Sequence, residues 1–139
     1  MNDMDFPTLT LILFSTTLLL FSCASTNQDK TIEQIAEEID ELVGNAEADS
    51  IEQCTIMPIG VKPAGGPWGY LVYSSKDTDL KKLEKLVSDY SKLDAERNEE
   101  SDAFSTADFA TEPSLKIQDG MCVGEGQYAW NPGEVRENT

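Results

Sequence analysis

The chain contains no histidine, only three cysteines and few basic residues in a length of 139. Without histidine it cannot form a His-containing catalytic triad, a Cys–His dyad or an imidazole metal site, because no other side chain titrates near neutrality without a strong perturbation. Its 26 acidic side chains outnumber the 10 basic ones, so the net charge is −16. That charge repels nucleic acids and anionic lipid headgroups. We therefore expect no nucleic-acid partner, and we interpret most of the acidity as a solvated surface.

The N-terminal part of the chain has one long apolar run, residues 9–21, which is followed by Ser22 and Cys23. A run this short is typical of the apolar region of a signal peptide, whereas a membrane-spanning helix needs about 20 apolar residues. The alternative is an uncleaved anchor helix over residues 6–24. In both cases we expect the rest of the chain to face an oxidising compartment.

The end of this run, Leu20-Phe21-Ser22-Cys23, resembles a bacterial lipobox. The resemblance implies a lipoprotein signal peptide over residues 1–22 and lipidation of Cys23, which would become the first residue of the mature chain. Two lipid signals give stable membrane attachment where one acyl chain does not. We therefore expect a lipid-anchored protein of the bacterial cell envelope, at the outer membrane facing the periplasm, with residues 23–29 as a polar tether.

Two helices are predicted after the tether. Residues 30–45 have apolar side chains at helical intervals, a capping-box spacing at Thr31 and Gln34, and a stop at Gly44. The acidic residues of this amphipathic helix are expected on its solvent face: Glu33, Glu37, Glu38, Asp40 and Glu41. A second, longer helix is predicted by a stripe of apolar side chains: Leu80, Leu83, Leu86, Val87, Tyr90 and Leu93.

Short β-branched or aromatic segments bounded by glycine or proline predict strands. They are residues 54–59, 70–74, 107–110, 115–117 and 121–123. Asp119-Gly120 favours a tight hairpin between the last two. We therefore expect an α+β fold, with a small antiparallel sheet of four or five strands packed against one long helix and preceded by the amphipathic helix. This domain is expected to cover residues 50–123, followed by a flexible tail over residues 124–139.

Two cysteines remain once Cys23 is assigned to lipid. Cys54 and Cys122 lie in the first and last predicted strands, and an even pair in an oxidising compartment is expected to form a disulfide. Closing a loop of this length stabilises a fold by roughly 4 kcal/mol in the chain-entropy model. A thiol nucleophile or metal ligand would need a neighbouring histidine or a Cys-x-x-Cys spacing, and the chain has neither.

The segment Gly60–Gly69, with sequence GVKPAGGPWG, is dense in glycine and proline. Restricted prolines and permissive glycines predict an ordered loop rather than a mobile one. We predict that it binds a partner protein through a cation, two flexible glycines and two aromatic side chains: Lys62, Gly65, Gly66, Trp68 and Tyr70. The alternative is that Trp68 and Tyr70 belong to the core and that the loop only reverses the chain.

This segment resembles a group of small bacterial envelope proteins and lipoproteins that carry Lys-Pro-Cys-Gly-Gly-Pro before an aromatic strand. Ser101-Asp102 and Gly120-Met121-Cys122 match later parts of the same pattern. The group has cysteine where this chain has Ala64 and Ala103, which implies the joint loss of one disulfide and the retention of the other. The resemblance implies no activity and no catalytic residue.

Enzymatic motifs are scarce. The chain has no Ser-x-x-Lys, no Gly-x-Ser-x-Gly and no phosphate-binding glycine loop. Only the carboxylates of Asp102, Asp108 and Glu112 could serve a hydrolase, and in so acidic a chain their proximity is expected by chance. We expect no enzyme, no cofactor and no metal. The expected function is a structural or partner-binding envelope module, whose loop would engage a protein as that of an inhibitor does, with a carboxylate-dependent envelope hydrolase as the alternative.

Overall fold

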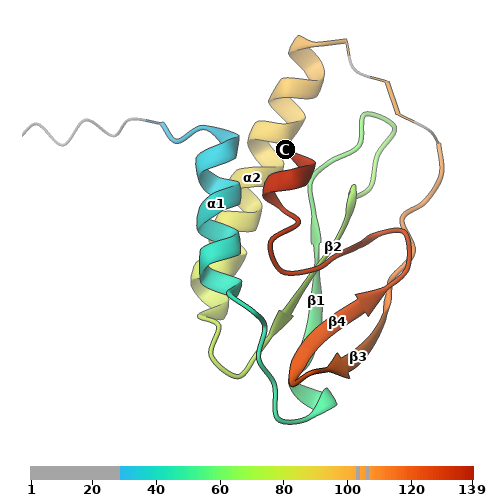
Figure 1. Ribbon diagram of the computed structural model, residues 1–139. Coiled ribbons are helices and arrows are strands. Elements are labelled where there is room, and N and C mark those ends of the chain that lie inside the picture. Colours follow the sequence, from blue (N-terminus) through green and yellow to red (C-terminus); the bar gives the residue numbers. More distant parts are fainter. Residues whose placement is uncertain (1–28, 103, 106) are drawn as a thin grey trace, which may run out of the picture.

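The computed structural model describes residues 29–102, 104–105 and 107–139 (Figure 1). The predictions on residues 1–28, including the signal peptide and lipidation of Cys23, lie outside the described residues, and so does Ala103. The described chain is α+β, with two helices and two small sheets, as the element order shows: α1, β1, β2, α2, β3, β4 and β5. In the described part of the chain, no helix is both long and apolar enough to cross a membrane.

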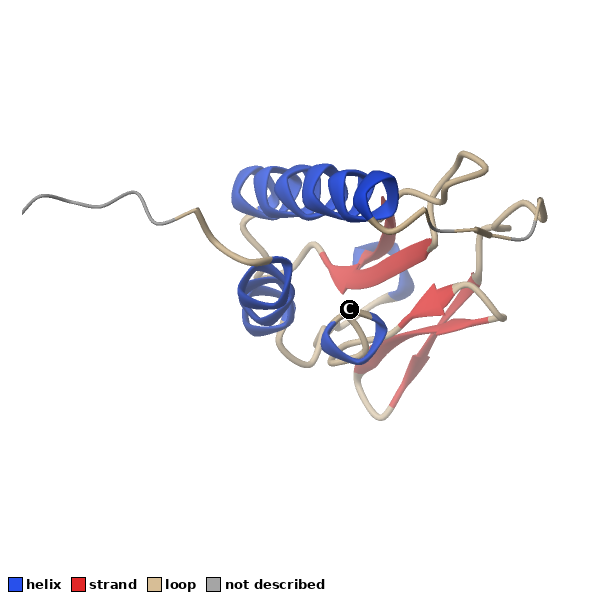
Figure 2. Cartoon of the chain, turned by 90° about the horizontal axis from the view of Figure 1, so that it is seen from above, coloured by secondary structure: helices blue, strands red, loops and turns tan. Residues whose placement is uncertain are grey.

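Both predicted helices are present and pack against each other (Figure 2). Helix α1 (Ile32–Val43) begins with the predicted capping box, in which Thr31 and Gln34 exchange side-chain and backbone hydrogen bonds. Helix α2 (Leu80–Glu100) begins at Asp79, whose carboxylate accepts a hydrogen bond from the Lys82 N–H. Leu80 was expected in the buried stripe, and that expectation is wrong: Leu80 is 47% exposed, whereas Leu83 in the same turn of α2 is fully buried.

The strands form two sheets rather than one. In the first sheet, β1 (Cys54–Ile59) pairs antiparallel with β2 (Gly69–Ser74), and β2 pairs in parallel with the short β5 (Ala129–Trp130). The second sheet is the hairpin of β3 (Ser114–Gln118) and β4 (Met121–Glu125). The predicted Asp-Gly turn joins these two strands, with both turn residues at positive φ.

The expectation of one antiparallel sheet of four or five strands against one long helix is therefore wrong. Strand β4 packs on β2 instead of extending its ladder, and Gly124 makes this possible, because a Cβ there would lie 2.7 Å from Val72 Cγ2. Residues 107–110, which were predicted as a strand, form no regular element. Both helices, not one, contribute buried side chains to the core.

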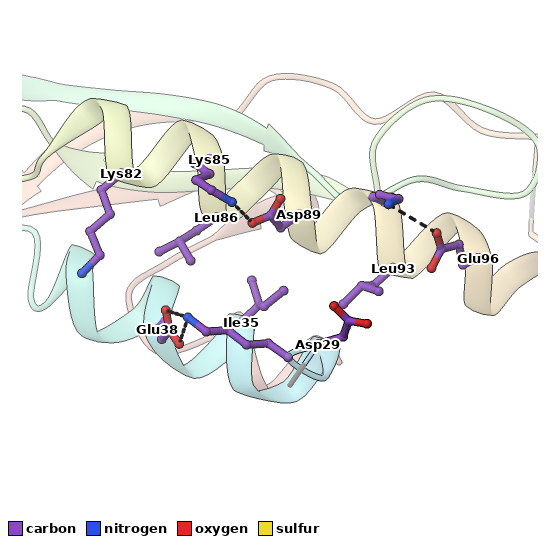
Figure 3. Close-up of a pocket in the computed structure, with 11 residues that line it drawn as sticks. Asp29, Ile35, Glu38, Lys82, Lys85, Leu86, Asp89, Leu93 and Glu96 are labelled. Carbon is purple, nitrogen blue, oxygen red and sulfur yellow. Dashed lines mark hydrogen bonds and ion pairs between the residues drawn. The ribbon is translucent and has the colours of Figure 1, made fainter. Parts of the chain in front are cut away.

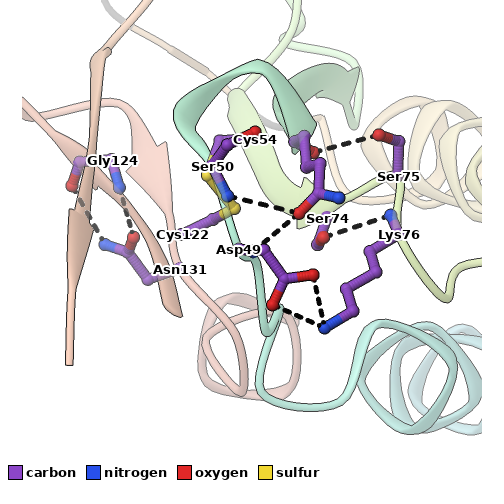
Figure 4. Close-up of a disulfide and its surroundings, with 10 residues drawn as sticks. Asp49, Ser50, Cys54, Ser74, Ser75, Lys76, Cys122, Gly124 and Asn131 are labelled. Atoms are coloured by element: carbon purple, nitrogen blue, oxygen red, sulfur yellow. Dashed lines mark hydrogen bonds and ion pairs between the residues drawn. A yellow bond between two sulfur atoms is a disulfide. The ribbon is translucent and has the colours of Figure 1, made fainter. Parts of the chain in front are cut away.

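The predicted disulfide is confirmed (Figure 4). Cys54 and Cys122 are bonded, with their Cα atoms 5.4 Å apart. Beside this bond, the Ala48 N–H donates to the Gly120 carbonyl over 2.9 Å, and the Cys122 N–H donates to the Ala46 carbonyl over 2.9 Å. The bond joins β1 to β4, so it links the two sheets covalently.

The segment after β4 is packed against the domain, so the prediction of a flexible tail over residues 124–139 is wrong. Trp130 is buried and meets the edge of the Tyr90 ring, with ring centroids 6.5 Å apart, and Val135 is fully buried. Gly69 leaves room for this indole, because a Cβ there would lie 2.4 Å from Trp130 Nε1. Burial of these two apolar side chains stabilises the packed position of a segment whose glycines and charges give no hydrophobic pattern.

Asp40 of α1 also holds this C-terminal segment. Its carboxylate accepts hydrogen bonds from the Gly133 N–H over 3.2 Å and the Arg136 N–H over 3.1 Å, and it pairs with Arg136 Nε at 3.3 Å. Asp40 was expected on the solvent face of α1, and that expectation is wrong, since its side chain is 3% exposed. A buried carboxylate is stable only with such donors around it.

Candidate functional site

The Gly60–Gly69 loop connects β1 to β2, and backbone hydrogen bonds link residues across it. The Trp68 N–H donates to the Ile59 carbonyl over 3.1 Å at the base of the loop. Near the tip, the Lys62 N–H donates to the Gly66 carbonyl and the Gly65 N–H donates to the Lys62 carbonyl, each over 2.8 Å. The loop is therefore ordered by its own hydrogen bonds, as the sequence predicts.

Gly65 and Gly66 form the tip, and both are exposed. Their φ angles are +98° and +80°, in a region that only glycine adopts without strain, and no atom lies within 4 Å of the Cβ position of either residue. The chain therefore needs glycine here for its backbone conformation, and not to avoid a neighbour. Pro63 and Ala64 are exposed beside them, so residues 63–66 present a rigid surface to solvent.

Asp94 of α2 fixes the base of the loop. Its side chain is 1% exposed and its Oδ2 accepts hydrogen bonds from the Val61 N–H over 2.8 Å and from Trp68 Nε1 over 2.9 Å. Its other oxygen, Oδ1, pairs with the Arg97 guanidinium at 3.0 Å. A charged acceptor forms stronger hydrogen bonds than a neutral one, so one carboxylate fastens two points of the loop to the helix.

Two more polar side chains of α2 continue this attachment. The Gly60 N–H donates to Ser91 Oγ over 3.1 Å, and Asn98 Nδ2 donates to the Val61 carbonyl over 2.6 Å. We did not predict Ser91, Asp94 or Asn98 as site residues. Their spacing of three and four residues places them on one face of the helix. The sequence offered one signal for Asp94: it lies one turn beyond Tyr90 on the buried stripe of α2.

Lys62 does not offer an exposed cation, so that prediction is wrong. It is 4% exposed, and its Nζ donates to the Asp108 backbone carbonyl over 3.1 Å and lies 3.4 Å from Asp108 Oδ2. The ammonium also lies 5.8 Å from the centre of the Trp68 ring and 5.2 Å from that of Tyr128. A buried lysine needs such compensation for its lost hydration, and two aromatic faces and a carboxylate supply it.

Tyr128 completes this cluster. Its hydroxyl donates a hydrogen bond to the Asp108 carboxylate, which raises the pKa of the Tyr128 hydroxyl because the bond stabilises the protonated form. Asp108 thus receives both an ammonium and a hydroxyl. Together these groups join the Gly60–Gly69 loop to the segment that follows α2.

The two predicted aromatic residues have mainly internal roles. Trp68 is half-buried, with its indole N–H bonded to Asp94, and Tyr70 is half-buried, with its hydroxyl 3.4 Å from the Ala110 carbonyl. The structure therefore gives Lys62, Trp68 and Tyr70 partners within the domain and leaves Gly65 and Gly66 exposed. Trp68 and Tyr70 therefore fit the alternative, in which the aromatic side chains pack inward, better than the prediction that they contact a partner directly.

The carboxylates considered for a hydrolase do not form a matched pair with free oxygens. Asp108 is engaged by Lys62 and Tyr128, while Asp102 and Glu112 are exposed. Among the described residues, no three His, Cys, Asp or Glu side chains are placed to hold a metal ion.

A groove of about 880 Å³ lies between the two helices (Figure 3). Ile35, Leu86 and Leu93 form its apolar floor. Its rim carries equal numbers of basic and acidic side chains: Lys30, Lys82, Lys85, Lys92, Asp29, Glu38, Asp89 and Glu96. Most of these charges pair with each other, and no residue of the Gly60–Gly69 loop lines the groove.

Comparisons with protein-family models, curated proteins and solved structures give no match to this chain. The function proposed below therefore rests on the residues of this chain alone.

Proposed function

We propose that the protein is a lipid-anchored component of a bacterial cell envelope that binds a partner protein through the Gly60–Gly69 loop. The observation that carries the proposal is the construction of this loop. Its base is fixed by the buried Asp94 and Lys62, while residues 63–66 at its tip are exposed. A surface that is already rigid loses little conformational entropy on binding, so a small contact area can give useful affinity.

The position of the loop relative to the start of the described chain supports this role. In Figure 1 the described chain begins at one side of the molecule, just before α1, and the Gly60–Gly69 loop lies at the opposite side. A chain anchored through Cys23 would hold the loop away from its own membrane attachment. The loop would then face other envelope proteins.

The contact residues in this proposal differ from those that the sequence predicts. The exposed tip, residues 63–66, touches the partner, and Lys62, Trp68 and Tyr70 position it from below. The hydrolase alternative receives no such support, because Asp108 Oδ2 is engaged by Lys62 and Tyr128.

Site-specific photocrosslinking tests the binding role. A photoreactive amino acid in place of Ala64 is expected to crosslink a protein in intact cells, whereas the same group in place of Lys81, which is exposed on α2, is expected not to. Substitution of both Gly65 and Gly66 by valine should abolish the crosslink, since β-branched residues are strained at positive φ. Equal crosslinking from positions 64 and 81 would contradict the role.

Labelling with an alkyne fatty acid tests the anchor separately. The wild-type chain should incorporate the label at Cys23, and the Cys23→Ala variant should not. If both chains are labelled equally, or if the mature N-terminus lies elsewhere, the lipid anchor is wrong and only the binding role remains.

A further inference from the structure

Two phenylalanines beside the loop are exposed to a degree that separates them from all other large apolar side chains described. Phe104 is 95% exposed and Phe109 is 87% exposed, while the next most exposed, Leu80, is at 47%. Burying one aromatic side chain removes about 150–250 Å² from water. Each of the two rings therefore leaves an apolar area of this order in contact with water.

These rings lie on a segment that is attached to the loop. Ser105, next to Phe104, accepts a hydrogen bond at its Oγ from the Ala64 N–H over 3.2 Å. Asp108, next to Phe109, is bonded to Lys62 and Tyr128. Each phenylalanine thus neighbours a residue that fastens the segment to the domain. The two rings and the loop tip belong to the same end of the molecule.

The charge around the rings restricts what can cover them. Residues 99–112 contain five acidic side chains and no basic one: Glu99, Glu100, Asp102, Asp108 and Glu112. Of these five carboxylates, Lys62 pairs with that of Asp108. A second copy of the same surface would meet it with like charge, and so would an anionic membrane.

We infer that Phe104 and Phe109, together with the loop tip, form an aromatic docking surface for a protein whose apolar contact patch is rimmed by lysine or arginine side chains. This inference rests on the proposed function and names the chemistry of its partner. The two rings provide the buried contact, and the surrounding carboxylates accelerate association and select a basic partner. The Gly60–Gly69 loop and the segment that follows α2 lie on the side of the molecule opposite the first described residues, away from the predicted anchor (Figure 1).

The test uses the full chain with p-benzoylphenylalanine in place of Phe109, a close match in shape, crosslinked in intact cells. Mass spectrometry of the crosslinked peptide should identify a second protein in which lysine or arginine flanks the attachment point. Changing Phe104→Ser in this background should lower the crosslink yield by at least about tenfold, as the loss of a central aromatic contact does. The matched change Ile51→Ser, at a side chain that is 44% exposed on a 3₁₀ turn, should leave the yield unchanged.

A pair of charge variants tests the electrostatic part. Glu99→Gln with Glu112→Gln should lower the crosslink yield several-fold, while Glu37→Gln with Glu41→Gln, which removes the same charge from the exposed face of α1, should not. Circular dichroism confirms that each variant is folded.

Several outcomes would overturn the inference. They are a crosslink to lipid, to a second copy of the chain or to an acidic peptide, no crosslink at all from position 109, and an equal effect of the two charge pairs. A crosslink from position 64 without one from position 109 refutes this inference and leaves the proposed function standing. Loss of the crosslink from both positions refutes both.

Discussion

Two buried aspartates hold two irregular segments of this chain by the same means. Asp94 of α2 fastens the Gly60–Gly69 loop, and Asp40 of α1 fastens the C-terminal segment after β5. Their side chains are 1% and 3% exposed, and each carboxylate accepts hydrogen bonds from two N–H groups and pairs with one arginine that is about half exposed. A helix-borne carboxylate thus replaces the strand neighbour that these segments lack.

The two segments differ in how their ends are held. The loop is closed by the β1–β2 ladder, in which Ile59 lies opposite Gly69, so its two ends stay paired when Asp94 is removed. Strand pairing holds the C-terminal segment only through the two residues of β5, and beyond them the buried Val135 side chain and the Asp40 carboxylate attach it to the domain. Loss of Asp94 therefore leaves two buried N–H donors of the loop without an acceptor. Loss of Asp40 instead allows the N–H donors of the C-terminal segment to move into water and hydrogen-bond there.

The largest effect is expected for Asp94→Ala. Its removal leaves the Val61 N–H and the Trp68 indole N–H without their acceptor, which should lower the free energy of unfolding by about 3–5 kcal/mol. Denaturant unfolding followed by circular dichroism measures it. The control is Asp89→Ala on the same helix, where an exposed pair with Lys85 is worth about 0.5 kcal/mol. Similar losses in the two variants would show that the buried carboxylate does not hold the loop.

A smaller and more local effect is expected for Asp40→Ala. We expect a loss of about 2 kcal/mol, because the freed Gly133 and Arg136 amides can hydrogen-bond to water. Hydrogen exchange should show faster exchange over residues 129–138 and unchanged protection in the Gly60–Gly69 loop. The exposed Glu41→Ala on the same helix is the control. Uniform loss of protection along the chain would remove the proposed difference between the two segments.

Tyr90, which lies near Asp94, should make the stability of the fold depend on pH. Burial raises the pKa of its hydroxyl from 10.0 to about 12, with the nearby Asp94 carboxylate as a smaller cause. The folded state keeps a proton that the unfolded state releases, so stability should fall as the pH rises from about 10 to about 12. Urea midpoints across this range should decline less in Tyr90→Phe. Equal declines would show that Tyr90 does not carry this dependence.

The smallest effects are expected at the two arginines. Arg97 is 43% and Arg136 is 56% exposed, so the Gln variants should each cost less than about 1 kcal/mol, because both aspartates keep their N–H donors. Thermal unfolding at two salt concentrations measures this difference. A loss as large as that of the matching aspartate variant would mean that the ion pair, and not the N–H groups, holds the segment.

The elements that sequence predicted correctly depend on local chemistry. The Thr31–Gln34 capping box, the Asp119-Gly120 turn and the apolar stripe of α2 each need only neighbouring residues. The disulfide was also predictable, because the expected lipidation of Cys23 leaves Cys54 and Cys122 as one pair of cysteines. The capping box, the turn and the apolar stripe can therefore be predicted without knowing the tertiary structure.

The errors concern residues whose role depends on distant partners. Lys62 and Asp40 look like ordinary surface charges, and only the fold brings Asp108 and the C-terminal amides to them. Trp130 and Val135 lie among glycine, proline and charges, so no periodicity marks them as core residues. Periodicity detects an element's face, but a two-residue strand has no period to detect.

The pairing of Asp40 with the C-terminal segment has a consequence for the order in which the protein can form. The donors to this carboxylate lie 93 and 96 residues further along the chain. A polypeptide that emerges with its N-terminus first therefore exposes α1 long before the groups that satisfy its buried charge have been synthesised. Until then that helix has a water-bound acid on the face that later becomes buried. The buried carboxylate of Asp40 therefore gains its partners only after residues 133–136 have been added to the chain, so this contact forms late in folding.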